Sequence, residues 1–319
     1  MLTIESFKKN EFFNIKILSI GGLGAYTMGQ MLGIELSKFN NLQTTTFASY
    51  SSEKKGAPIN VFIKILNSDK PIRDFSNIKK SNILIVFKEE LLKDKNNLIG
   101  IDDNSIILIN THRNAEEIVK KYELPAQHIY TIDATKISIK HDSKINMIMF
   151  GAIHCFFNFL NPHESVNQIS DKLKARYQHL IEKNTQAFHD GFLETKYYDN
   201  HYNFPPIKEN IINIGFNNQL EGGIILGANS FLIDRSISRE GYIPEFNQEL
   251  CINCTKCDFT CPDDCFIWEE QEGRRGRTEM ILTGINYQYC KGCMRCVNVC
   301  PTEALTKKIE IDLGVNYDK

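Results

Sequence analysis

Short apolar runs alternate with stretches of helical periodicity over the first part of the chain. Residues 14–20 form one such run, the glycine-rich turn 21–24 follows, and apolar residues then recur every three or four positions to residue 39. This pattern predicts a buried strand, a turn and a helix, which together open a parallel α/β unit. Further strands are predicted at 44–48, 59–66, 82–87, 105–110 and 128–133, with a helix at 115–122. The expected fold is a layered, Rossmann-like α/β domain.

The hydrophobic pattern then becomes helical and finally irregular. Residues 145–160 predict one buried helix at a domain or subunit contact, which is too short and too polar to span a bilayer. Residues 164–191 predict an amphipathic helix. Prolines and glycines loosen the pattern from residue 197 to 239, which indicates an extended connector. We therefore expect a first domain at 1–198, a connector at 199–240 and a second domain at 241–319.

A repeated cysteine motif dominates the second domain. The motif C-x2-C-x2-C-x3-C-P occurs twice, first with Cys251, Cys254, Cys257 and Cys261, then with Cys290, Cys293, Cys296 and Cys300. Three closely spaced thiolates can surround three corners of a [4Fe–4S] cube, while the fourth cysteine points away and ligates the other cluster. Proline suits the first turn of a helix, so each fourth cysteine is predicted to start a helix.

This spacing predicts crossed ligation of two [4Fe–4S] clusters. One cluster is expected on Cys251, Cys254, Cys257 and Cys300, and the other on Cys290, Cys293, Cys296 and Cys261. The domain should be an α+β bacterial-type 2[4Fe–4S] ferredoxin that transfers electrons. Zinc is the alternative ion, but a zinc site needs neither the third cysteine nor the proline. Disulfides are disfavoured because the start of the chain does not resemble a signal peptide.

Two further cysteines fall outside the predicted ligand sets. Cys265 follows Cys261 by four residues, as Ala304 follows Cys300, so it is expected to be a small packed residue, with a spare-ligand role left open. Cys155 lies in an apolar run and is expected in the core. The formal net charge of −2 argues against a general nucleic-acid or membrane-surface binder. Thiolate ligation of iron implies a reducing compartment, so we expect a cytoplasmic protein of anaerobic metabolism.

Three other sites are weaker candidates. Thr27 replaces the third glycine of G-x-G-x-x-G after the glycine turn, which disfavours a dinucleotide site, although phosphate could still bind at that helix N-terminus. Lys54 and Lys55 beside Gly56 would contact an anionic ligand or a partner subunit, or form a solvated loop. A hairpin tip within 272–277 carries Arg274, Arg275 and Arg277, which would dock an acidic electron carrier or form a solvated turn.

The order of these motifs resembles the 2-oxoacid:ferredoxin oxidoreductases, whose gamma and delta subunits would be fused here. The gamma-like motifs are the turn 19–24, with Ser19 in place of the family's first glycine, the segment 55–57 in place of an Arg-Gly-Gly loop, and Asn146 with Gly151 and Ala152. The delta-like motifs are 241–244, both cysteine motifs and 286–293.

The resemblance implies an electron-transfer subunit. Thiamine diphosphate and Mg²⁺ would bind on separate alpha and beta subunits, because the chain contains no G-D-G motif. Electrons would leave to ferredoxin or flavodoxin, and coenzyme A would approach near the gamma domain, although Lys55 and Ala57 depart from the family pattern there. The alternatives are a stand-alone iron–sulfur reductase or carrier with a nucleotide-binding α/β domain, and an assembly module with structural clusters. The 2-oxoacid is not encoded in this chain.

Overall fold

The computed structural model describes residues 2–39, 42–50, 56–175, 177–208, 222, 234–272 and 278–310. The chain divides into two compact units, Met1–Ile211 and Ile212–Lys319. Among the predicted site residues, Lys54, Lys55, Arg274, Arg275 and Arg277 lie outside the described ranges.

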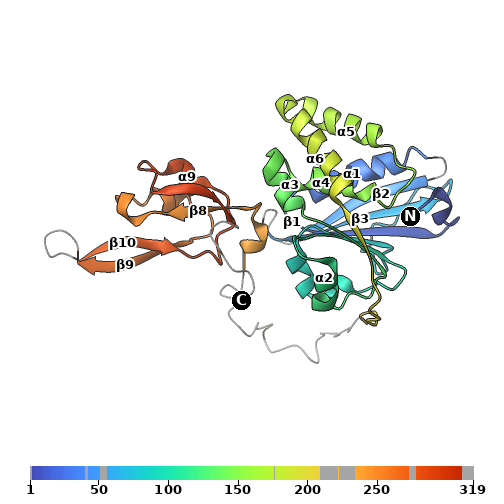
Figure 1. Ribbon diagram of the computed structural model, residues 1–319, viewed down its shortest axis with the longest axis horizontal. Helices are drawn as coiled ribbons and strands as arrows, with labels where there is room; N and C mark the ends of the chain where they lie inside the picture. Colours follow the sequence, from blue (N-terminus) through green and yellow to red (C-terminus); the bar gives the residue numbers. More distant parts are fainter. Residues whose placement is uncertain are drawn as a thin grey trace. The chain divides into compact units, whose positions relative to one another are not determined.

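A mixed sheet forms the centre of the first unit (Figure 1). Its described residues give seven strands in the order β2-β3-β1-β4-β5-β6-β7. The strands are β1 (Phe12–Ile20), β2 (Leu42–Tyr50), β3 (Pro58–Asn67), β4 (Ile83–Val86), β5 (Ile106–Asn110), β6 (His128–Ile132) and β7 (Lys196–Asp199). The layered α/β fold and the six predicted strands are confirmed. The expected parallel opening is wrong, because β3 runs antiparallel between β1 and β2, and parallel pairing starts at β1–β4.

The edge strand β7 was not predicted from the sequence. It pairs antiparallel with β6, and the ring of Tyr197 packs on that of Tyr130 with 5.1 Å between centroids. Asn200 then donates its amide hydrogens to the carbonyls of Leu124 and Ala126. The first unit therefore continues past residue 198, where the predicted connector began, because cross-strand packing and these hydrogen bonds hold the chain against the sheet.

Helices cover both faces of this sheet. They are α1 (Ala25–Leu36), α2 (Ala115–Tyr122), α3 (Ala134–His141), α4 (Ile145–Ile153), α5 (Pro162–Lys174) and α6 (Ile181–Glu194). In Figure 1, α2 lies on one face, and α1, α3, α4 and α6 lie on the other.

Two of the predicted helix bounds are wrong. The helix expected over 145–160 ends at Ile153, because the following residues pair with the N-terminus through Leu2 N–H to Phe156 O (2.7 Å) and Asn158 N–H to Leu2 O (3.3 Å). The helix expected over 164–191 is two helices, α5 and α6. Asn161 caps α5 and Pro162 occupies its first turn, where no backbone donor is required.

Close backbone contact joins α4 to α6. A Cβ atom on Gly151 would lie 1.9 Å from the carbonyl oxygen of Phe188, and one on Gly191 would lie 2.2 Å from that of Ile148. Both glycines therefore allow an approach that no other residue permits. Beside this contact, Ser165 donates to Glu35 (2.5 Å), and the buried His154 lies 2.9 Å from the same hydroxyl through Nε2.

The second unit is a small α+β domain. Its elements are β8 (Tyr242–Phe246), α8 (Lys256–Thr260), β9 (Phe266–Glu272), β10 (Thr278–Ile285), α9 (Arg295–Val299) and β11 (Leu305–Ile309). The strand β8 pairs antiparallel with β11, and β9 pairs antiparallel with β10. Four cysteines, Cys257, Cys265, Cys290 and Cys296, belong to its buried core. The predicted hairpin is confirmed by the β9–β10 pairing on either side of residues 273–277.

A buried arginine connects the segment before β8 to the residue that follows β11. Arg239 is 1% exposed and forms an ion pair with the buried Glu310. Its Nε donates to the carbonyl oxygen of Cys290 at 2.8 Å, and its Nη2 donates to that of Tyr287. The segment before β8, the residue after β11 and the second cysteine motif are thus held by one side chain.

Candidate metal centres

Two cavities in the second unit divide the eight motif cysteines into two sets of four. The first cluster cavity is lined by Cys251, Cys254, Cys257 and Cys300. The second cluster cavity is lined by Cys261, Cys290, Cys293 and Cys296. In the described ranges, no group of three or more Cys, His, Asp or Glu side chains is arranged to hold a single metal ion. The cavities instead bring together the two crossed sets that the spacing predicts.

Left-handed backbone conformations shape both motifs in the same way. Thr255 (φ 61°) and Met294 (φ 57°) occupy equivalent positions just before α8 and α9. Asn253 (φ 51°) and Gly292 (φ 67°) also correspond, and all four lie between motif cysteines. Alternation between left-handed and right-handed residues turns successive N–H groups inward and creates a concavity suited to anions. Each loop can therefore wrap thiolates around a bound group.

The fourth cysteine of each motif ends a helix, so the predicted helix start is wrong. Cys261 is the C-terminal cap of α8, and Cys300 is that of α9, both in extended conformation. The proline after each cysteine suits this position, because proline cannot continue a helix. Each fourth cysteine lines the cavity that holds the first three cysteines of the other motif.

Cys265 lies beside the second cavity and contacts two of its thiols. Its side chain is 3% exposed, and its backbone N–H donates to the sulfur of Cys261 at 3.5 Å. Interaction with the Cys265 side chain lowers the pKa of Cys261 to about 6 and that of Cys290 to about 7. Its equivalent Ala304 lines the first cavity and is equally buried. Cys265 therefore occupies the packed position expected from the repeat, and its thiol also faces a predicted ligand set.

A carboxylate with two cationic partners lies beside the second cavity. Asp263 lines the second cavity and pairs with Lys291 (3.0 Å) and Arg235 (3.4 Å). Cys254 and Cys293 are exposed residues, one in each set. Each set thus includes one cysteine at the surface of the second unit.

The glycine turn of the first unit lies next to Gly56. Gly56 N–H donates to Gly21 O (2.9 Å), and Gly21 N–H donates to Ala57 O (2.8 Å). Gly24 has φ 82° and receives a hydrogen bond from the amide of Asn146 at 3.2 Å. The structure therefore brings together two predicted gamma-like motifs and Gly56, which the linear sequence separates.

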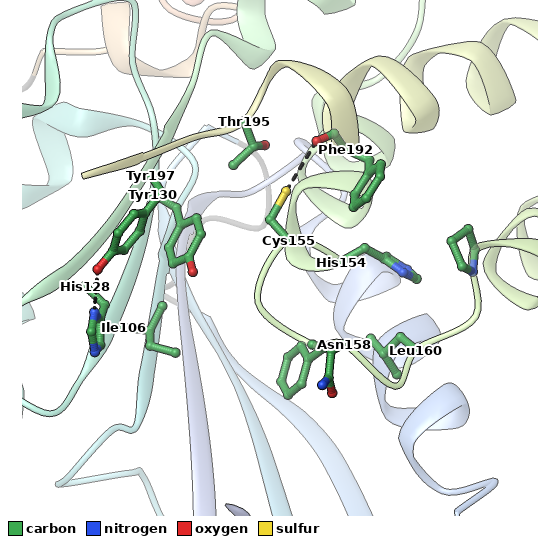
Figure 2. Close-up of a pocket in the computed structure, with 12 residues that line it drawn as sticks. Ile106, His128, Tyr130, His154, Cys155, Asn158, Leu160, Phe192, Thr195 and Tyr197 are labelled. Atoms are coloured by element: carbon green, nitrogen blue, oxygen red, sulfur yellow. Dashed lines mark hydrogen bonds between the residues drawn. The ribbon is translucent and has the colours of Figure 1, made fainter. Parts of the chain in front are cut away.

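A separate pocket of about 710 Å³ lies in the first unit between the edge of the sheet and α6 (Figure 2). Tyr130, Tyr197 and His128 stand on one side, with His128 Nδ1 at 2.9 Å from the Tyr197 hydroxyl. Cys155 stands on the other side and donates to Phe192 O at 3.3 Å. The prediction that Cys155 belongs to the core is wrong, because it is half-buried and lines this pocket. Burial nevertheless raises the pKa of its thiol.

Two features of the second unit were missed in the sequence. Arg239 lies in the irregular segment, where no periodicity marks it as buried. Trp268 of β9 lines the first cluster cavity, and only its place after the first motif could have indicated this.

Among the described residues, no helix is long and apolar enough to cross a membrane.

Comparisons with known proteins match the two units separately. The family model described as pyruvate ferredoxin/flavodoxin oxidoreductase matches residues 14–194, and the 4Fe-4S dicluster domain model matches residues 250–304. The second match supports iron–sulfur clusters in the second unit.

Relatives of known sequence or structure follow the same division. The common subunit gamma of the pyruvate/ketoisovalerate oxidoreductases of Pyrococcus abyssi is 25% identical over 56% of this chain and 95% of its own. The pyruvate synthase subunit PorD of Thermotoga maritima is 42% identical over 22% of this chain and 61% of its own. The crystal structure of the pyruvate oxidoreductase subunit PORC of Thermotoga maritima covers 60% of this chain and all of its own, at 25% identity and a TM-score of 0.50.

Proposed function

Because the chain belongs to the pyruvate ferredoxin/flavodoxin oxidoreductase family, we propose that it is the electron-transfer subunit of a 2-oxoacid:ferredoxin oxidoreductase, with gamma and delta parts fused. The chain is a subunit of an oxoacid oxidoreductase that carries a 4Fe-4S domain. The proposal adds the route: electrons pass from thiamine-dependent alpha and beta subunits through two clusters to ferredoxin or flavodoxin.

The observation that carries this proposal is the division of eight cysteines between two cavities. We assign one [4Fe–4S] cluster to Cys251, Cys254, Cys257 and Cys300, and the other to Cys261, Cys290, Cys293 and Cys296. Thiolates are the protein ligands of such clusters, and four are required for each.

Two clusters suit the electron count of the reaction. Oxidative decarboxylation of a 2-oxoacid releases carbon dioxide and two electrons, and thiamine diphosphate on partner subunits would supply the carbanion chemistry. A [4Fe–4S] cluster accepts one electron at a time, so two clusters together hold the pair. The exposed Cys254 and Cys293 give each cluster one point near the surface for electron exchange.

Crossed ligation can be tested with single serine substitutions in the anaerobically purified chain. Cys257→Ser and Cys261→Ser lie in one motif, but they should abolish the electron paramagnetic resonance (EPR) signals of different clusters. Cys257→Ser and Cys300→Ser lie in different motifs, but they should abolish the same signal. Loss of one signal by both Cys257→Ser and Cys261→Ser would contradict the assignment.

We propose that an acidic electron carrier docks on Arg274, Arg275 and Arg277, which lie in the sequence between β9 and β10. Replacing all three by Ser should lower the rate of carrier reduction at low salt, because opposite charge accelerates encounter. The difference should disappear at high salt. An unchanged stopped-flow rate at low salt would reject this docking site.

The segment with Lys54, Lys55 and Gly56 is proposed to contact an anionic ligand or a partner subunit. Coenzyme A is the anionic ligand to test, because the family resemblance implies that it approaches near the gamma domain. Gly56 supports the proposal by lying against the glycine turn at Gly21. Replacing both lysines by Ala should raise the KM for coenzyme A or weaken subunit retention. If neither the KM for coenzyme A nor the retention of subunits changed, the proposed contact would be rejected.

The overall proposal is tested by anaerobic purification of the native complex through this chain. Alpha- and beta-like subunits should co-elute with thiamine diphosphate and at least about eight irons per copy of this chain. A chain that elutes alone with its irons would instead be a self-contained carrier or reductase, and nicotinamide titration of its clusters would identify the latter.

A further inference from the structure

The indole of Trp268 has a buried donor without a partner. Its Nε1 atom is shielded from solvent and has no hydrogen-bond partner among the described residues. Trp268 lies in β9 opposite Leu282, which is 1% exposed, and both side chains line the first cluster cavity. The residue that carries the donor therefore lines the same cavity as Cys251, Cys254, Cys257 and Cys300.

A buried N–H group without an acceptor destabilises the folded protein, and the first cluster cavity is where an acceptor could bind. The indole nitrogen can only donate, so water or a protein oxygen would have to accept. Leaving such a group unpaired is destabilising, and exceptions in native proteins call for an explanation such as a bound ion or a redox role. Thiolate and sulfide sulfurs are the acceptors that a [4Fe–4S] cluster would bring into this cavity.

We propose that Trp268 donates an N–H···S hydrogen bond to the cluster held in the first cavity and thereby raises the reduction potential of that cluster. The inference rests on the proposed cluster ligation. Reduction adds negative charge to a cluster, so a donor aimed at its sulfur stabilises the reduced state more than the oxidised state.

The second half of the repeat places a different residue at this position. With the offset of 39 residues, Trp268 corresponds to Lys307 of β11, whose Nζ lies 3.7 Å from the centroid of the Tyr242 ring. Lys307 is exposed and does not line the second cavity. The indole donor therefore acts on one cluster only, and the two clusters are chemically inequivalent although their ligand spacing is the same.

The direct test is an EPR-monitored redox titration of the full chain with both clusters loaded. Trp268→Phe keeps an aromatic ring and removes the donor. It should lower the equilibrium constant for reducing one cluster about tenfold, which is about 59 mV for a one-electron couple, and leave the other cluster unchanged. A shift of less than about twofold in both clusters, or an equal shift in both, would overturn the proposal.

A matched control separates the donor from the packing of the cavity. Phe246 also lines the first cavity, and its ring carries no N–H group. Phe246→Leu should change neither potential by as much as Trp268→Phe does. An equal effect of the two substitutions would mean that packing, not the hydrogen bond, sets the potential.

A second measurement needs no substitution and remains informative if Trp268→Phe fails to fold. Trp268 is the only tryptophan of the chain, so labelling with ¹⁵N-indole introduces one nitrogen label. Pulsed EPR of the reduced chain should show a ¹⁵N hyperfine coupling to one cluster. No coupling in a chain with about eight irons would overturn the hydrogen bond, whereas a chain without iron would contradict the cluster proposal itself.

Discussion

The buried Arg239–Glu310 pair should control how long the second unit retains its clusters. Arg239→Met would leave the carboxylate of Glu310, whose side chain is 6% exposed, without its cation. The carbonyl oxygens of Cys290 and Tyr287 would also lose their donor. Removal of one partner from a buried ion pair costs about 3–5 kcal/mol, so we expect about 4 kcal/mol of destabilisation.

This energy is large relative to the stability of a domain, which is about 5–15 kcal/mol. If iron is lost only from the opened unit, 4 kcal/mol increases the opened population by about a thousandfold, since each 1.36 kcal/mol is a factor of ten. The assay is the rate at which an iron chelator bleaches the clusters of the anaerobic full chain. That rate should rise steeply in Arg239→Met and by less in Arg239→Lys, which keeps the charge but loses the planar donor geometry.

Two controls define the result. Lys308→Met removes an exposed cation that pairs with Glu245 in the same unit, and it should change stability by no more than about 1 kcal/mol. Combining Arg239→Met with Glu310→Met should be less harmful than Arg239→Met alone, because no unpaired charge remains buried. A wild-type bleaching rate in Arg239→Met, or a double variant worse than the sum of the single variants, would refute the reasoning.

Three further predictions concern particular residues. Burial lowers the pKa of His154 from 6.5 to about 4. The unfolded chain therefore binds a proton that the folded chain does not, and stability is lost as pH falls from 6.5 to 4. In chemical unfolding, the wild type should lose up to about 3 kcal/mol more than His154→Gln over this range, and equal losses would contradict this pKa shift. Gly151→Ala should destabilise the first unit by about 3 kcal/mol or more, because its Cβ would overlap the carbonyl oxygen of Phe188, and an unchanged melting temperature would reject this contact. Cys265→Ala should retain about eight irons, whereas Cys261→Ala should lose one cluster; iron loss in Cys265→Ala would make that residue a ligand.

Local patterns predicted the parts of the fold that local chemistry determines. The strands β1, β3, β4, β5 and β6 were found because buried parallel and central strands are largely continuous apolar runs. The edge strand β2 is rich in threonine and half-buried, and its β-branched residues indicated a strand. The two sets of cysteines that meet in each cavity follow from the spacing of one repeated motif. Neither prediction needed knowledge of distant contacts.

The missed features depend on contacts between distant segments. The helix ending at Ile153 could not be predicted, because the apolar residues that follow it are buried by pairing with Leu2. The strand β7 is only four residues long and alternates little, so its identity depends on its neighbour β6. Arg239 is buried because carbonyl oxygens and Glu310 surround it, and a single charged residue in an irregular segment carries no periodic signal.

Each cavity of the second unit takes three cysteines from one motif and the fourth from the other. The two halves of the unit are therefore cross-linked twice once both clusters are bound. Oxygen damage to either cluster would release three cysteines of one motif and the fourth cysteine of the other. That fourth cysteine follows directly after the loop that holds the surviving cluster. We expect inactivation by air to proceed almost as a single event, with little accumulation of chains that hold one intact cluster.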